Sequence, residues 1–193
     1  MNIIQRAKSI ILKPKLEWET IASEEPNVAQ LFTGYVIPLA LIPAAATVIG
    51  LIVFSGGIIT SFNWVILTGV IQFVATVVGV YITAFVVDAL AQHFESQKNI
   101  GRATQLVAYS FTPAWVAGVC NIIPFLGWVA IIGSIYGIYI LFLGFPPLMK
   151  TPKDKVPIYL IITMVILIIV YFIIGAVLSS LLFASLGLNA LTI

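Results

Sequence analysis

Charged side chains are scarce in this chain of 193 residues. Asp, Glu, Lys and Arg together make up 8% of it, while hydrophobic residues make up 61%. A soluble domain carries about 25% charged residues. The composition therefore excludes an ordinary soluble domain and predicts an all-α, polytopic membrane protein.

Cysteine and histidine are also nearly absent. The single cysteine, Cys120, excludes an internal disulfide. Asp88, the single histidine His93 and Glu95 are weak candidates for metal ligands, but their spacing matches no strong zinc motif. We expect no metal and no cofactor here. A polar cluster that fixes helix ends, or a gate or proton-linked site, are the alternatives.

Catalytic signatures are missing as well. The sequence has no His-Glu-x-x-His, no Gly-x-Ser-x-Gly, no phosphate loop and no second intramembrane aspartate to pair with Asp88. This absence favours a non-enzymatic protein. The basic residues of the N-terminal arm are typical of anionic-lipid contact rather than of a nucleic-acid site.

Long apolar runs are what the sequence does contain. Two of them form a hairpin, because the uncharged turn 121–124 joins residues 103–120 to residues 125–145. A helix needs roughly 20 apolar residues to cross a hydrocarbon core of about 30 Å. On this basis the sequence predicts five membrane-spanning helices, over residues 32–54, 64–89, 103–120, 125–145 and 156–183.

The charges predict how the chain crosses the membrane. With these five spans, all nine basic residues fall on one side: in the N-terminal arm, after the second span and after the fourth. Positive charge marks the cytoplasmic side. We therefore expect residues 1–30 to form a cytoplasmic arm and residues 31–193 to form the membrane domain. The N-terminus would lie in the cytoplasm, the C-terminus outside, and the membrane would be a bacterial plasma (inner) membrane.

The first 13 residues predict an amphipathic helix. Ile3, Ile4, Ala7, Ile10 and Ile11 share one face at helical spacing. The opposite face would carry Gln5, Arg6, Ser9 and Lys13. Such a basic helix lies in the membrane surface, although packing on the protein itself is the alternative. A second short helix over residues 15–24 would follow. The predicted lipid-surface contacts are Arg6, Lys8, Lys13, Lys15 and Trp18.

Several short motifs occur in a fixed order. Tyr109 is followed four residues later by Pro113, and a span rich in Gly and Tyr then leads to a Gly-Phe-Pro and Met-Lys-x-Pro exit. This order resembles the Yip family, the Ypt/Rab-interacting membrane proteins, in its compact bacterial form. The eukaryotic Asp-Leu-Tyr-Gly-Pro motif and long acidic tail are absent, so Rab binding is not carried over. The resemblance singles out Tyr109, Pro113, Gly137, Tyr139, Gly144, Pro146, Lys150 and Pro152.

Two hypotheses of function follow. The first is a Yip-like, non-enzymatic protein that organises membrane, or recruits a membrane or cytoplasmic protein partner, through its cytoplasmic face. The second is a small-solute or ion permease with a polar path from Gln72 to Asp88, since a charge at membrane depth is a functional hypothesis by default. Gly133 and Gly137 form a small-xxx-small motif that indicates internal packing or a homo-oligomer.

Overall fold

The computed structural model describes residues 2–54 and 62–185, and those residues form helices and short connections without a β-strand. This confirms the all-α prediction. Residues 55–61, between the first two predicted spans, and residues 186–193, after the last predicted span, lie outside the described residues. In order, the elements are α1 (Ile3–Leu12), α2 (Pro14–Ser23), α3 (Val28–Leu31), η1 (Phe32–Val36), α4 (Ile37–Phe54), α5 (Phe62–Leu90), η2 (Ala91–Phe94), α6 (Ile100–Ser110), α7 (Thr112–Ala117), η3 (Gly118–Ile122), η4 (Pro124–Leu126), α8 (Val129–Met149) and α9 (Val156–Ser185).

Four helical stretches of the described residues are long and apolar enough to cross a membrane: Val28–Phe54, Phe62–Phe94, Pro124–Met149 and Val156–Ile174. The predicted span at residues 103–120 is instead divided among α6, α7 and η3. The break has a local cause, because Pro113 has no N–H to donate to the carbonyl of Tyr109. The count of five spans therefore stays a prediction.

The first long helical stretch, Val28–Phe54, is irregular near its prolines. A π-helical turn, η1, ends two residues before Pro38, and the N–H of Ile37, which follows the turn, bonds to the carbonyl of Phe32, five residues back. Pro43 remains inside α4. Single π turns often occur at functional sites. Here the turn places Gly34 and Tyr35 at the edge of a cavity described below.

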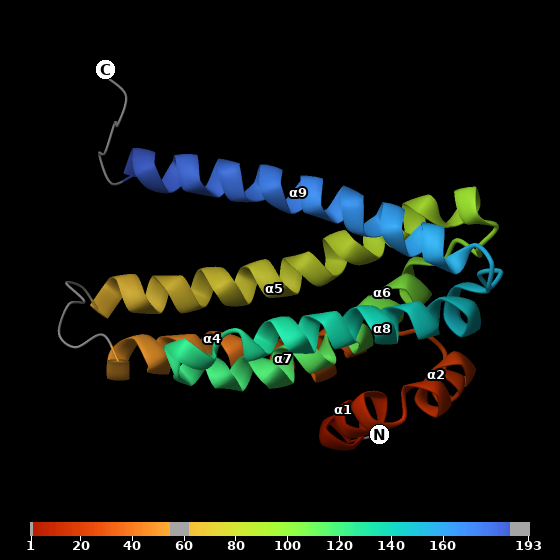
Figure 1. Ribbon diagram of the computed structural model, residues 1–193, viewed down its shortest axis with the longest axis horizontal. Helices are drawn as coiled ribbons and strands as arrows, with labels where there is room; N and C mark the ends of the chain where they lie inside the picture. Colours follow the sequence, from red (N-terminus) through yellow and green to blue (C-terminus); the bar gives the residue numbers. More distant parts are fainter. Residues whose placement is uncertain (1, 55–61, 186–193) are drawn as a thin grey trace.

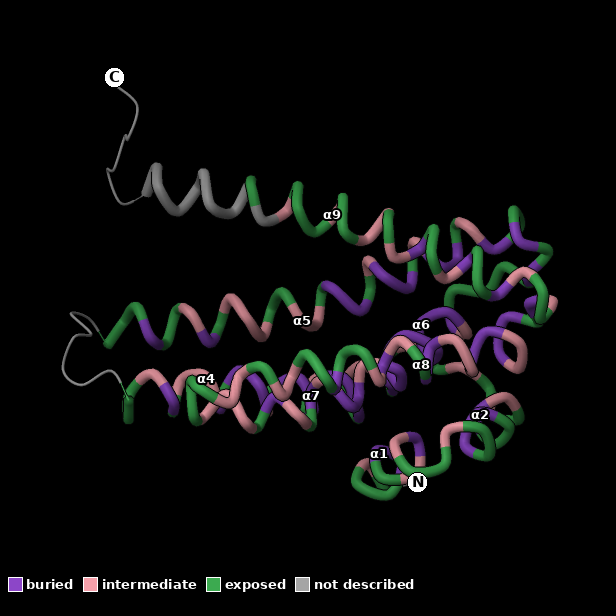
Figure 2. Tube along the Cα trace, in the orientation of Figure 1, coloured by how far each residue is buried: buried purple, intermediate pink, exposed green. Residues whose placement is uncertain are grey.

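Figure 1 shows how the helices are arranged. The α7 helix lies beside both α4 and α8, and α5 contacts α4 and α6. The α1 and α2 helices lie together at the side of this bundle, against α6, α7 and α8. The α9 helix contacts α5 and α8, and much of its described length is exposed or half-buried (Figure 2). The bundle thus has an arm on one flank and a lightly packed last helix on another.

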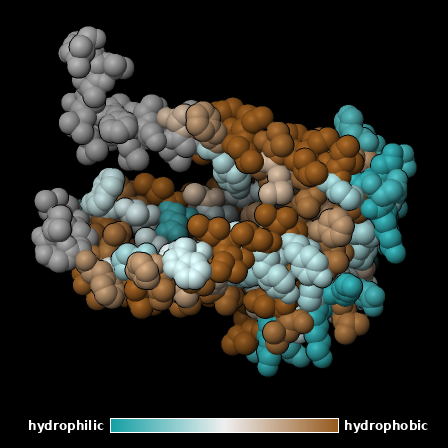
Figure 3. All heavy atoms as spheres, viewed as in Figure 1, coloured by the Kyte–Doolittle hydropathy of each residue, from teal (hydrophilic) through white to brown (hydrophobic). Residues whose placement is uncertain are grey.

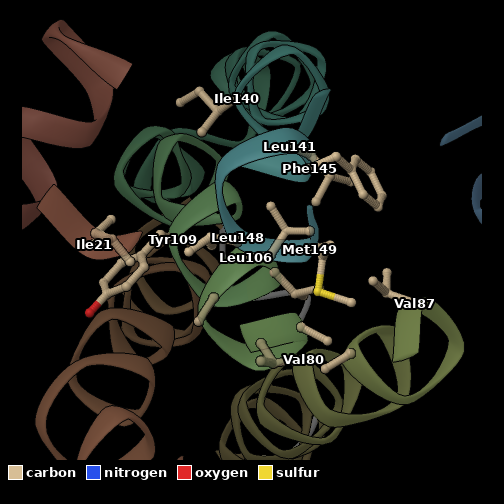
Figure 4. Close-up of a cluster of buried hydrophobic side chains, with 14 of the residues drawn as sticks. Ile21, Val80, Val87, Leu106, Tyr109, Ile140, Leu141, Phe145, Leu148 and Met149 are labelled. Carbon is tan, nitrogen blue, oxygen red and sulfur yellow. The ribbon is translucent and has the colours of Figure 1, made fainter. Parts of the chain in front are cut away.

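The α6 helix is the buried centre of the bundle. Every residue from 103 to 110 is buried, although this segment includes Thr104, Gln105 and Ser110. Figure 4 shows Leu106 among buried apolar side chains from α5 and α8, including Val87 and Met149. With 11 residues, several of them polar, α6 is too short and too polar to count as a membrane span by itself.

The two loops that carry basic residues meet at one end of the bundle. The N–H of Gln97 donates to the carbonyl of Met149 over 2.8 Å. Lys155 lies 3.2 Å from the carboxylate of Glu95. Hydrophilic atoms gather at this end in Figure 3. The structure therefore agrees with the one-sided charge of the sequence, while the side of the membrane that this end faces stays a prediction.

Small residues of α5 contact two different neighbours. A Cβ on Gly69 would meet the Val48 side chain of α4 at 2.3 Å. A Cβ on Gly79 would meet the Tyr171 hydroxyl of α9 at 2.6 Å. These residues therefore permit close contact with α4 and with α9 at different heights of the helix.

Candidate functional site

Arg6 is a buried cation between the two arm helices. It is 5% exposed. Its Nη1 donates to Glu17 Oε1 over 2.6 Å, and its Nη2 bonds to Glu24 Oε1. Burial alone would lower the pKa of the Arg6 guanidinium, but the bond to Glu24 and the charges of Glu24, Glu17 and Tyr109 raise that pKa above its ordinary value. Arg6 therefore stays charged and ties α1 to α2.

Tyr109 connects this ion pair to the bundle. The guanidinium carbon of Arg6 lies 5.5 Å from the centre of the Tyr109 ring, which is a cation–π distance. Tyr35 contacts the same ring edge-on, with centroids 4.8 Å apart. The Tyr35 hydroxyl is hydrogen-bonded to Thr112 Oγ1 at 2.7 Å. Residues from α1 and η1 thus meet at Tyr109 of α6, and Tyr35 connects them to α7.

Three hydrogen bonds fix the arm against the bundle. Trp18 Nε1 donates to the carbonyl of Ile140 over 3.0 Å. The Tyr136 hydroxyl donates to the carbonyl of Ile11 over 2.7 Å. Arg102 Nη1 donates to the carbonyl of Ile21 over 3.1 Å. We name this set of contacts, together with the bonds of Arg6 and Tyr109, the arm clamp.

Glycines of α8 make the close approach possible. A Cβ on Gly144 would lie 2.4 Å from Leu106 Cδ1 and 2.7 Å from Trp18 Cε2. A Cβ on Gly137 would lie 2.6 Å from the carbonyl oxygen of Ser110, and one on Gly133 would lie 2.6 Å from that of Pro113. The small-xxx-small motif therefore packs inside this chain, against the broken helix of α6 and α7.

A cavity of about 270 Å³ lies beside the arm clamp. It opens among α1, the segment 24–35 and α6. Its walls carry more polar than apolar groups, although the bundle around it is mostly apolar. The lining includes Arg6, Glu24, Glu25, Gln105, Tyr35 and Tyr109.

The structure brings only some of the predicted motif residues together. Tyr109, Gly137 and Gly144 belong to the contact between α6, α8 and the arm, and Pro113 lies one helical turn away. Tyr139 is instead exposed and stacks on Tyr136. Outside this contact, Lys150 is exposed at the end of α8, while Pro146 and Pro152 are half-buried.

Two predicted lipid contacts are placed differently from the expectation. Arg6 and Trp18 are 5% and 1% exposed, so protein surrounds both side chains. Arg6 also shares the buried face of α1 with Ala7 and Ile10, rather than lying opposite them. The reason is that Glu17, Glu24 and the Ile140 carbonyl satisfy these polar groups internally. Lys8, Lys13 and Lys15 are exposed.

Gln72 and Asp88 do not face one another. Gln72 lines a surface cavity with Phe111, Trp115 and Tyr171, and Asp88 is not part of that lining. Both residues belong to the single helix α5. Sixteen residues at 100° each rotate a helix by about 160° beyond four full turns, over about 24 Å. The two side chains therefore leave α5 on nearly opposite faces.

Asp88 is buried, and its Oδ1 has no hydrogen-bond partner among the described residues. His93 and Glu95 are exposed. Among residues 2–54 and 62–185, no three His, Cys, Asp or Glu side chains come close enough to hold a metal ion. The three weak metal candidates are thus not gathered into a ligand set.

Sequence reasoning missed several residues of the clamp and the cavity. Glu17 and Glu24 had little signal, because Glu24 lies just beyond the end of α2, in extended backbone. Tyr35 and Gln105 had none, since their roles depend on contacts between distant segments.

The long apolar helices, the one-sided charge and the docked arm define a multi-pass α-helical membrane protein. The model of the Yip1 domain matches residues 8–189, so the chain belongs to the Yip1 domain family. The resemblance noted in the sequence is thereby confirmed.

Curated relatives agree with this family. The chain is similar to Inner membrane protein YohC of Escherichia coli strain K12, with 22% identity over 151 residues that cover 74% of this chain and 77% of that protein. YohC of E. coli O6:H1 strain CFT073 gives the same figures. No solved structure matches the chain.

Proposed function

We propose that this protein is a non-enzymatic organiser of the bacterial inner membrane, which acts through the surface of its docked arm at the cytoplasmic face. The similarity to YohC, which is named an inner membrane protein, supports the location. The positive charges at one end of the bundle support the cytoplasmic side.

The observation that carries the proposal is the exposed face of the arm. Ile4, Leu12 and Leu16 are 72%, 64% and 61% exposed, whereas Ile10 and Ile21 of the same arm are fully buried. Lys8 lies between Ile4 and Leu12 at four-residue steps, on the same side of α1. Exposed apolar side chains interleaved with lysines are the pattern of a helix in the membrane surface.

A groove between the arm and α8 offers a second lipid contact. It has a volume of about 640 Å³, and Phe142, Leu143 and Pro146 are among its apolar walls. Lys15 of α2 and Lys153, in the loop between α8 and α9, also line it. Each such lysine contributes about 1 kcal/mol to attraction toward an anionic surface.

The test measures where the arm surface lies. In full-length Cys120→Ser protein in nanodiscs of anionic lipid, a spin label on Leu12→Cys should be more accessible to oxygen than to an aqueous nickel complex. Lys98→Cys, an exposed position between η2 and α6, is the control and should show the reverse. If both positions prefer the aqueous reagent, the arm faces the cytoplasm, and recruitment of a soluble partner replaces contact with lipid.

The permease hypothesis receives less support. The proposed path needs Gln72 and Asp88 on a common face, whereas α5 separates them by about 160°. Solute or ion flux through proteoliposomes that falls with Asp88→Asn would revive this hypothesis.

A further inference from the structure

The cavity beside Arg6 has features of a binding site that the arm clamp does not explain. Most polar groups of the arm clamp have a hydrogen-bond or ion-pair partner within the protein. Two side chains of the cavity wall are not. The Tyr109 hydroxyl makes no hydrogen bond to any described residue, although Tyr109 is only 7% exposed. Figure 4 shows this hydroxyl pointing away from the buried apolar cluster.

Gln105 is the second unmatched group. It is 4% exposed, and its Oε1 accepts a hydrogen bond from Arg102 Nη1 at 3.2 Å. Its amide nitrogen donates to no described residue. Neither atom belongs to the fully enclosed polar atoms that lack a partner, so both are open to the cavity and can bond to a molecule or to solvent inside it.

The charges of the wall decide which molecule fits. Arg6 is already bound to Glu17 and Glu24, one carboxylate on each Nη. Glu25 adds a further carboxylate to the lining and makes no ion pair with a described residue. Carboxylates therefore outnumber guanidinium groups here, and an anion would be repelled.

We propose that this cavity binds the ammonium group of a small amine, either a free amine or the ethanolamine headgroup of a lipid. The carboxylates of Glu25 and Glu24 accept hydrogen bonds from the ammonium. The phenol of Tyr109 and the amide of Gln105 bond to the hydroxyl or ester oxygen that follows two carbons further on. The volume of about 270 Å³ is below the usual range for drug-sized ligands, and it suits a group of this size.

The proposal does not depend on whether the outer face of α1 touches lipid. The cavity lies on the inner side of the arm, and its lining includes none of Ile4, Leu12 and Leu16. A failure of the spin-label experiment would therefore leave this site untouched, and the reverse is also true.

In the first arm of the experiment, ethanolamine is titrated into full-length protein in nanodiscs made without ethanolamine lipid, and calorimetry measures the binding. Acetate and phosphate are the anionic controls. In a second arm, native mass spectrometry asks whether protein extracted from membranes with phosphatidylethanolamine retains that lipid in preference to phosphatidylglycerol. Saturable binding in the first arm identifies a free amine, and selective retention in the second identifies a lipid headgroup.

Two variants test the assigned groups. Glu25→Gln removes a charge without touching the bonds of Arg6, and it should weaken amine binding about tenfold. Tyr109→Phe keeps the ring for Arg6 and Tyr35 but loses the hydroxyl, and it should weaken binding several-fold. Glu19→Gln is the matched control and should bind as the wild type does. Absence of amine binding in both arms, equal binding of acetate, or wild-type affinity in both Glu25→Gln and Tyr109→Phe would overturn the proposal.

Discussion

The indole N–H of Trp18 donates a hydrogen bond to the main-chain carbonyl of Ile140, 122 residues further along the chain, over 3.0 Å. The carbonyl lies in the apolar helix α8, and the indole is fully enclosed by the protein. The N-terminal arm is therefore a part of the folded bundle rather than an appendage. Removal of the whole arm would uncover this contact, so single substitutions are the sharper tests of its role.

Gly144→Ala should loosen the arm. The new methyl group would lie 2.4 Å from Leu106 and 2.7 Å from Trp18, and both are buried core residues. Overpacking of this kind costs about 1–3 kcal/mol. Thermal unfolding of the purified protein and trypsin cleavage at the arm lysines measure the effect.

Gly34→Ala is the control for that experiment. A Cβ on Gly34 meets nothing within 4 Å, and alanine is the better helix former. Its stability should equal or slightly exceed that of the wild type. Equal stability of Gly34→Ala and Gly144→Ala would show that α8 and Trp18 are not in close contact.

Arg6→Met should release the arm by a different route, because it leaves Glu17 buried without its partner. Loss of one member of a buried ion pair costs roughly 3–5 kcal/mol, and we expect the lower end since Glu24 is partly exposed. Hydrogen exchange of the α1 amides should rise. Lys8→Met, at an exposed position of the same helix, should change it little.

The double variant Arg6→Met, Glu17→Met sharpens this prediction. Replacing both members of a buried pair by apolar residues is often neutral. Most of the lost protection should therefore return. If the double variant exchanges as fast as Arg6→Met alone, the cost does not come from an unpaired Glu17.

Gly137→Ala should destabilise the folded monomer rather than alter association. Its Cβ would lie 2.6 Å from the carbonyl oxygen of Ser110 in the same chain. We expect a lower Tm with an unchanged mass by light scattering in detergent. A change of oligomeric state at constant Tm would instead assign this glycine to a contact between two copies.

The sequence predicted the helices better than it predicted their partners. Composition and charge were enough for the long apolar helices and for the grouping of basic loops at one end. The face of α1 was harder, because helical periodicity cannot distinguish a lipid surface from a protein surface. Arg6 was therefore assigned to the exposed side, whereas two carboxylates and the Tyr109 ring enclose it.

The polar cavity could not have been predicted. Tyr35, Gln105 and Glu25 approach one another only after α3, α6 and the arm have packed. The π turn that positions Tyr35 has no clear sequence signal beyond the proline that follows it. Such features depend on tertiary contacts, which a single sequence does not record.

Site-directed labelling tests the central claim, that one end of the bundle gathers the arm and both basic loops on the cytoplasmic side. In a Cys120→Ser background, a membrane-impermeant maleimide would be applied to inside-out and right-side-out vesicles that carry Lys98→Cys, Lys153→Cys or Asn63→Cys. The account predicts that Lys98→Cys and Lys153→Cys react only in inside-out vesicles, and that Asn63→Cys reacts only in right-side-out vesicles. Reaction of Lys98→Cys and Lys153→Cys from opposite sides would contradict it.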